Sequence, residues 1–263
     1  MKKKLFFAQM LVILTVLFIM GIGAAASSTM SVDNSQGVLR VSYSMSASDH
    51  IKVKVAHGGN TYYYDLTRSE EAFPLQFGNG DYSVALYQLV QGNEYRVLTQ
   101  TNVTVSFGSE QTAFLGSMQV VNWNEAMAAI KKAHALAKGA GSADKKIEIL
   151  YSFVSKNVKY DYPKAASIAA GYIPSVESTY ETKKGICYDY SALFGAMLRC
   201  EGIPSKLMKG YKSDMSEYHA WNQVYMDGKW VTIDTTYDSS AATMGLRYQM
   251  IKSNSEYRIS KYY

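Results

Sequence analysis

The spacing of the apolar residues changes near residue 115, and this change most limits the folds open to the chain. Before it, runs such as Val38–Tyr43 and Ile51–Val55 alternate apolar and polar residues, and turn-rich breaks such as Gly78–Asp81 separate the runs. Alternation with a period of two, interrupted every ~8–12 residues, is typical of the short strands of a β-sandwich. We therefore expect an all-β sandwich over about residues 35–115.

Beyond that point the apolar residues follow helical spacing. Asn124 is expected to cap a helix over residues 125–138. Ser142 is expected to cap a second helix, whose apolar stripe includes Ile147 and Leu150. Strands followed by helices and further strands predict an α+β fold.

Two segments are expected to lack regular structure. The small, polar residues 27–36 predict a flexible leader, and residues 160–182, which contain Pro163 and Pro174, predict a loop with short turns. Aromatic residues make up 13% of the chain, which is too many for a disordered protein. We place a second domain at about residues 120–263.

The chain begins with a pattern typical of a secretory signal. Lys2–Lys4 precede the apolar run Leu5–Met20, and Ala24–Ala26 end the segment with small residues. We expect residues 1–26 to be a signal peptide, with an uncleaved membrane anchor as the alternative. Both predict a secreted or cell-surface protein. Loss of the segment lowers the net charge from +5 to +2, which leaves no electrostatic basis for binding nucleic acid.

Cys187 lies where the sequence predicts the start of a helix. Gly185 interrupts the preceding chain, residues 188–200 carry apolar side chains with helical spacing, and Gly202 and Pro204 follow the helix. A helix N-terminus favours an anion, so a cysteine placed there ionises readily and is a good nucleophile. This position alone does not distinguish a nucleophile from a small buried residue.

A hairpin is predicted where Asp227-Gly228 joins two alternating stretches, residues 218–226 and 229–236. The two-residue turn fixes the pairing, so that His219 and Asp234 become diagonal neighbours on one face, ~7–8 Å apart at their Cα atoms. A slip of one residue would place them on opposite faces. The hairpin therefore predicts an imidazole and a carboxylate within bonding reach.

A thiol, an imidazole and a carboxylate form a set that catalyses acyl transfer. The His219 imidazole would take the proton of Cys187, and Asp234 would orient the ring and stabilise its positive charge. As isolated residues, His219 could equally be a structural histidine and Asp234 a strand-end cap. Their combination with a helix-start cysteine favours the catalytic interpretation.

The order of sequence blocks in this region resembles the transglutaminase-like superfamily of cysteine proteases. The resemblance covers about residues 120–263 and is strongest from 183 to 238. It implies a papain-like core, with a nucleophilic helix packed on an antiparallel sheet and a Cys187–His219–Asp234 triad. The blocks are Gly185–Ala192, Met197–Arg199, Gly202–Pro204, Lys209–Tyr211, Tyr218–Asn222 and Asp227–Thr236.

The resemblance implies a peptidase that works through a thioester intermediate. The backbone N–H of Cys187 would bind the oxyanion, and we expect Tyr180 to be the second donor. The substrate would be a protein or peptide, with a cell-wall peptide as one option. We expect no cofactor and no metal ion, and the sequence does not indicate an oligomeric state.

Three other functions stay open at this point. A protein-crosslinking transglutaminase would share the same thioester, since only the acceptor differs. A non-enzymatic surface scaffold would keep the fold without the chemistry. A wall-binding protein would use the β module to bring the enzyme domain to wall peptides.

Several residues near these blocks receive structural interpretations. Trp221 and Trp230 are expected in the core, with the wall of a substrate groove as the alternative. Cys200 would lie ~20 Å from Cys187 along one helix, too far for a disulfide. The carboxylates that could suggest a calcium site lack the spacing of calcium loops and are expected to face solvent. They are Asp189, Asp214 and Glu217.

Overall fold

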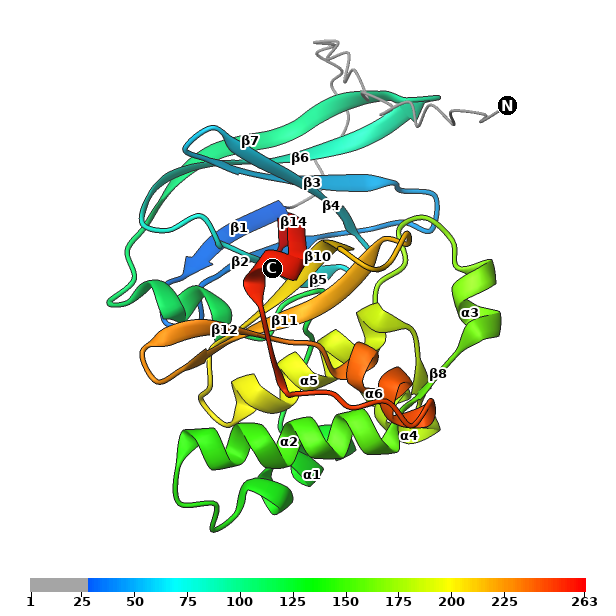
Figure 1. Ribbon diagram of the computed structural model, residues 1–263. Coiled ribbons are helices and arrows are strands. Elements are labelled where there is room, and N and C mark those ends of the chain that lie inside the picture. Colours follow the sequence, from blue (N-terminus) through cyan, green and yellow to red (C-terminus); the bar gives the residue numbers. More distant parts are fainter. Residues whose placement is uncertain (1–27) are drawn as a thin grey trace.

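The computed structural model describes residues 28–263, so the expected signal peptide lies outside the described residues. The N-terminal strands form two antiparallel sheets, which Figure 1 draws one above the other. The three-stranded sheet has the order β1 (Ser28–Asp33), β2 (Val38–Tyr43), β5 (Glu70–Pro74). The four-stranded sheet has the order β4 (Asn60–Leu66), β3 (Ile51–His57), β6 (Gly80–Gln91), β7 (Glu94–Val105). Buried side chains of both sheets belong to one hydrophobic core, and the expected N-terminal all-β region is confirmed.

The prediction of a flexible leader at residues 27–36 is wrong for its first half. Residues 28–33 form strand β1, which pairs with all six residues of β2. Met30 and Val32 also pack against the core. The small polar residues suggested a loop, but pairing with a neighbouring strand and burial of two apolar side chains override that local preference.

The second half of the chain combines helices with a five-stranded antiparallel sheet of order β13-β12-β11-β10-β14. Two short strands, β8 and β9, form a separate parallel pair. The helices are α1 (Ala128–Ala137), α2 (Ala143–Asn157), α3 (Tyr162–Ser167), α4 (Val176–Thr182), α5 (Cys187–Cys200) and α6 (Thr235–Thr243), with 3-10 turns η1 (Glu110–Phe114) and η2 (Asn254–Glu256). The strands are β8 (Lys159–Tyr160), β9 (Lys184–Gly185), β10 (Ser205–Lys212), β11 (His219–Met226), β12 (Lys229–Ile233), β13 (Ile251–Lys252) and β14 (Tyr257–Tyr262).

Helix α5 is the centre of this half. It packs on β10 and β11 on one side and on α1, α2 and α4 on the other (Figure 1). Its residues from Tyr188 to Arg199 are all buried. A helix that is apolar on all sides needs such a double cover, because no stripe of it can face water. The predicted α+β fold is confirmed.

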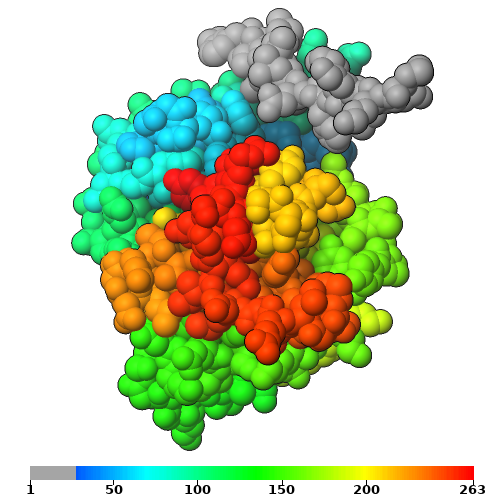
Figure 2. Space-filling model, viewed as in Figure 1, coloured from blue at the N-terminus to red at the C-terminus, as the bar shows by residue number. Residues whose placement is uncertain are grey.

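Strand β14 connects the two halves. Figure 2 shows the red C-terminal segment crossing the molecule toward the blue and cyan N-terminal sheets. The backbone N–H of Tyr262 donates to the hydroxyl of Tyr62 at 3.1 Å, and the Gln76 side chain donates to the carbonyl of Tyr262 at 3.3 Å. Among the described residues, no helix has both the length and the apolar character needed to cross a membrane.

The structure revises the start of the first predicted helix. Asn124 accepts a bond from Ala126 N–H and forms a turn, so α1 begins only at Ala128. The first N–H groups of α1 donate instead to the Glu177 carboxylate, at 2.7 and 3.1 Å. Ser142 caps α2 as predicted, by accepting from Lys145 N–H.

The segment predicted as a loop, residues 160–182, contains two short helices. Asp161 caps α3 and Ser175 caps α4, each through its side-chain oxygen. The prolines that suggested a loop are compatible with this, because Pro163 occupies the first turn of α3, where no N–H bond is lost.

The predicted hairpin is confirmed over its paired part. Asp227 and Gly228 have φ values of 49° and 75°, as a tight two-residue turn requires. The pairing runs from Met226–Lys229 to Asn222–Ile233. The second strand was expected to reach residue 236, but β12 ends at Ile233 and helix α6 begins two residues later.

Candidate active site

Cys187 is the first residue of α5 and is partly exposed. Two residues, Gly185 before the helix and Asp189 in its first turn, fix this helix start. The Asp189 carboxylate accepts the N–H of Ile186 at 2.8 Å. Gly185 leaves room for Asp189, since a Cβ at position 185 would lie 2.6 Å from the Asp189 Cβ. The thiol therefore stands at a helix N-terminus, as the sequence predicted.

His219 and Asp234 meet in the structure. The Nε2 atom of His219 lies 2.8 Å from Oδ2 of Asp234, and both side chains are buried. Asp234 was expected to lie on the second strand of the hairpin, but it is the N-cap of α6. Its Oδ1 accepts Tyr237 N–H at 2.9 Å. The hydroxyl of Tyr257 donates to Oδ2 at 3.0 Å. Three donors therefore hold the carboxylate in place.

The surroundings of His219 favour its protonated form. Burial lowers its pKa, but the charge and hydrogen bond of Asp234, followed by the hydrogen bond and charge of Cys187, raise the pKa from 6.5 to about 10. With Nε2 bonded to Asp234, the other ring nitrogen, Nδ1, is left for the thiol. The structure thus bonds His219 to Asp234 and places both His219 and Cys187 on the wall of one cavity.

Cys187 and His219 open onto a cavity of about 430 Å³. Its walls are mainly aromatic rings and methionines, as is common in sites that bind organic groups. Its remaining lining residues are Tyr160, Tyr162, Ala165, Met215, Glu217, Tyr218, Thr236, Tyr237, Ser240 and Met244. The buried Oγ1 atom of Thr236 has no hydrogen-bond partner among residues 28–263.

Tyr180 does not line this cavity, and its expected role as oxyanion donor is not supported. It lies on α4 with its ring 6.2 Å from the ring of Phe153, and the Lys183 ammonium lies 3.4 Å from the ring centroid. This packing on the side of α2 uses the ring as a structural contact. The sequence placed a donor upstream of Cys187 but could not say which tyrosine reaches the site.

Tyr160 is the upstream tyrosine that does line the cavity. The parallel pairing of β8 with β9 places Tyr160 opposite Gly185, two residues before Cys187. Its hydroxyl has no hydrogen-bond partner within the described residues, and burial raises its pKa to about 12, with the Cys187 charge as a further cause. Tyr160 therefore presents a protonated O–H group to the site.

The residues with structural interpretations mostly follow expectation. Trp221 is 1% exposed and stacks on His219 at 6.2 Å. Trp230 packs against Phe114 and Tyr225, so the core interpretation holds for both tryptophans. Both cysteines are free, and burial raises the pKa of Cys200 to about 12.

Asp189 corrects one expectation, because its carboxylate is fully buried rather than solvent-facing. It pairs with Lys164 at 2.6 Å and accepts the hydroxyl of Tyr172. Asp214 pairs with Lys212 at 2.7 Å. These ion pairs give Asp189 and Asp214 structural partners.

One group of side chains in the described part of the chain has donor atoms close enough for a metal ion, namely His134, Cys200 and Glu201, within 4.8 Å of one another. His134 already bonds Glu201 through Nδ1 at 2.6 Å and Glu125 through Nε2 at 3.0 Å. Lys146 occupies the second oxygen of Glu201 at 2.6 Å. His134, Glu201, Glu125 and Lys146 therefore form an ion-pair network beside Cys200.

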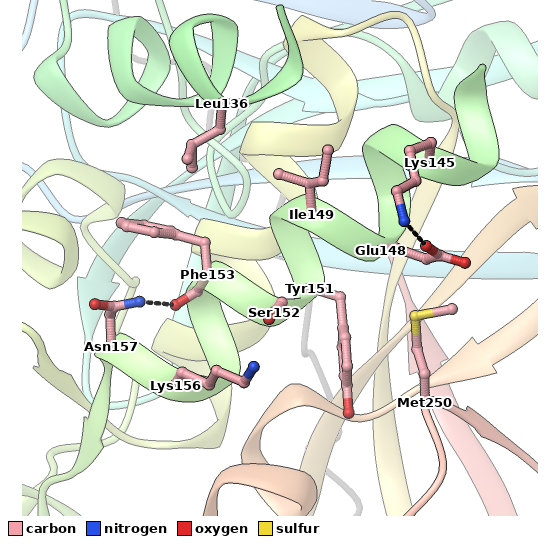
Figure 3. Close-up of a pocket in the computed structure, with 10 residues that line it drawn as sticks. All are labelled: Leu136, Lys145, Glu148, Ile149, Tyr151, Ser152, Phe153, Lys156, Asn157 and Met250. Carbon is pink, nitrogen blue, oxygen red and sulfur yellow. Dashed lines mark hydrogen bonds and ion pairs between the residues drawn. The ribbon is translucent and has the colours of Figure 1, made fainter. Parts of the chain in front are cut away.

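A second hollow lies on the outer side of α2. Figure 3 shows Leu136, Ile149 and Phe153 on one side of the helix and Met250 on the other. Lys145 and Glu148 form an ion pair at its edge, at 2.7 Å. None of its ten lining residues is a cysteine or histidine.

The fold and this site define a class of protein. Residues 130–235 match the family described as the transglutaminase-like superfamily. This part of the chain is therefore similar to transglutaminase-like core domains, and the resemblance seen in the sequence is confirmed.

The chain is also similar to individual proteins. The chain is 33% identical to UPF0252 protein MJ1282 of Methanocaldococcus jannaschii over 117 residues, which cover 40% of this chain and 33% of that protein. It is 27% identical to kyphoscoliosis peptidase of Mus musculus over 114 residues, which cover 40% of this chain and 17% of that protein. The matched region thus spans a third or less of these relatives. The crystal structure of red sea bream transglutaminase aligns with 12% identity and a TM-score of 0.34, over 75% of this chain and 47% of that one.

Proposed function

We propose that the protein is a secreted cysteine-dependent acyl hydrolase or transferase, and specifically a peptidase that cleaves amide bonds of a protein or peptide. The observation that carries this proposal is that Cys187, at a helix N-terminus, and His219, bonded to Asp234 at 2.8 Å, open onto one cavity. The residue pattern of 1–26 supports export.

In the proposed reaction the proton of the Cys187 thiol is held on Nδ1 of His219, so that the sulfur attacks as a thiolate. The thiolate attacks the carbonyl carbon of the substrate, and the electron pair of the C=O bond moves to oxygen. When the oxyanion collapses, the C–N bond breaks and the imidazolium gives its proton to the leaving amine. A thioester to Cys187 remains. Water or a second amine, deprotonated by the imidazole, then releases the acyl group.

The oxyanion needs donors that are already in place. The N–H of Cys187 at the start of α5 is the first, and we propose the hydroxyl of Tyr160 as the second, in place of Tyr180. Tyr160→Phe should lower kcat by about 10²-fold with little change in KM. The control Tyr162→Phe removes a hydroxyl from a neighbouring ring of the same cavity, 72% exposed, and should leave kcat near the wild-type value. Equal effects of the two substitutions would exclude Tyr160 as a donor.

The proposed class is tested with iodoacetamide and a peptide library, using the purified protein and Cys187→Ala. We expect fast alkylation of Cys187, no alkylation of Cys200, and cleaved peptides only from the wild type. Adding a biotinylated primary amine separates two outcomes, since biotinylated peptide would show a crosslinking transglutaminase. Slow alkylation of Cys187 with no turnover would instead indicate a non-enzymatic scaffold.

A further inference from the structure

The ammonium of Lys209 lies near the rings of Tyr188 and Tyr218. Lys209 belongs to β10, next to Gly210, which pairs with His219. Its Nζ atom is 3.9 Å from the ring centroid of Tyr188 and 5.7 Å from that of Tyr218. Tyr188 directly follows Cys187, and Tyr218 directly precedes His219 and lines the cavity. The cation is therefore held by two aromatic rings whose residues adjoin Cys187 and His219 in the sequence.

This cation has no acidic partner. No carboxylate within residues 28–263 forms an ion pair or a hydrogen bond with Lys209, in contrast to Lys164, Lys212 and Lys252, which each bond to a carboxylate. Burial lowers the pKa of Lys209, and the negative charge that opposes this effect is that of Cys187. A partly desolvated charge without a counter-charge is costly, and such groups gather at functional sites.

We propose that Lys209 is a second electrostatic partner of the Cys187 thiolate, beside His219, and stabilises the negative charge that the sulfur carries before attack. The proposal rests on the proposed function only in that it assigns Cys187 the nucleophilic role. No proton moves to or from Lys209 in this role. The ammonium stays charged, and its field acts through the low-dielectric space between the Tyr188 and Tyr218 rings.

Lys206 provides a matched control on the same strand. Its Nζ atom also lies over aromatic rings, 4.0 Å from the centroid of Trp230 and 4.8 Å from that of Phe114. It forms no ion pair with the described residues, and burial lowers its pKa as well. Cys187 does not contribute to that shift. Lys206 thus matches Lys209 in strand, charge and packing but not in proximity to the thiol.

The experiment measures alkylation of Cys187 by neutral iodoacetamide and by anionic iodoacetate, in the wild type, Lys209→Met and Lys206→Met. Peptide mass spectrometry after digestion gives the rate constant at Cys187 for each reagent. Lys209→Met should lower the iodoacetate-to-iodoacetamide rate ratio by roughly three- to tenfold, and Lys206→Met should leave the ratio unchanged. In 1 M salt, where the screening length is about 3 Å, the difference between wild type and Lys209→Met should shrink.

Lys209→Arg keeps the charge and should keep the wild-type ratio, so it separates loss of charge from loss of packing. A wild-type ratio in Lys209→Met would overturn the proposal, and so would an equal fall in Lys206→Met. Labelling does not require turnover. If the ratio falls but no peptide is cleaved by any variant, the proposed function fails and the electrostatic role stands. If peptides are cleaved and the rate ratio is the same in all variants, the proposed function stands and the electrostatic role of Lys209 fails.

Discussion

Replacing Asp234 with Asn should remove the pH dependence that His219 gives to stability, when tested in a Cys187→Ala background. Burial lowers the pKa of His219, but Asp234, with smaller contributions from Cys187, raises it from 6.5 to about 10. Because the folded pKa is the higher one, the folded state keeps a proton that the unfolded chain releases above pH 6.5. The stabilisation is complete below pH 6.5 and is lost as the pH rises through the folded-state pKa of His219, which lies below 10 once the contributions of Cys187 are removed.

The Cys187→Ala background is needed because, in the proposed reaction, the proton that His219 holds comes from the Cys187 thiol. In a thiolate–imidazolium pair the folded protein holds an extra proton on the ring and lacks one on the sulfur, so net proton uptake nearly cancels. With the thiol absent, only the ring proton counts, and one proton changes the free energy of unfolding by at most about 1.4 kcal/mol per pH unit. Between pH 6.5 and 9 this free energy should therefore fall by up to about 3 kcal/mol.

The assay is urea unfolding at several pH values from 6.5 to 9, for Cys187→Ala alone and combined with Asp234→Asn or Asp214→Asn. Asp214 is the matched control, since it is a carboxylate near the site that bonds Lys212 and Tyr237 but not His219. The decline should persist with Asp214→Asn and flatten with Asp234→Asn. An equal decline in all three proteins would refute the assignment of the proton to the His219–Asp234 pair.

Three further substitutions test buried or capping contacts of the second half of the chain by urea or thermal unfolding. Tyr257→Phe removes the 3.0 Å bond to Asp234 and should cost about 1 kcal/mol; an unchanged stability would contradict that bond. Arg199→Met leaves buried backbone carbonyls without the donor that now reaches three of them and should cost about 3 kcal/mol. Glu177→Ala removes the carboxylate that caps α1 and should lower the free energy of unfolding by about 1 kcal/mol. Glu181 lies on α4 with Glu177 and is exposed, so Glu181→Ala should change the stability little.

Local geometry made part of the site predictable. The dipeptide Asp227-Gly228 specifies a two-residue turn because its residues tolerate positive φ, and the turn sets the register of the whole hairpin. This register carries His219 to the side of Asp234, which the structure confirms at 2.8 Å. Gly185 likewise marked the start of α5 because a local close approach excludes a side chain there.

Contacts between distant segments could not be predicted in the same way. The Tyr257 hydroxyl reaches Asp234 from 23 residues away, and Glu177 caps α1 from 49 residues away. Neither contact leaves a periodic signal. The position of Tyr160 on the cavity wall was not predicted for a related reason. The parallel pair of β8 and β9 has two residues on each strand, which is too short to show alternation in the sequence. The choice of Tyr180 followed from sequence order alone, which does not encode direction in space.

The two helices that frame the cavity both begin at a buried carboxylate, and this explains why the site is fixed. Asp189 accepts the N–H of Ile186 and also holds Lys164, on the helix that carries cavity residues 162 and 165. Asp234 accepts the N–H of Tyr237 and also holds His219. Each carboxylate satisfies helix donors that would otherwise lack partners and simultaneously orients a wall or a reacting group. A shift of either helix start would therefore break a bond within the site, so helix capping and preorganisation of the site depend on the same atoms.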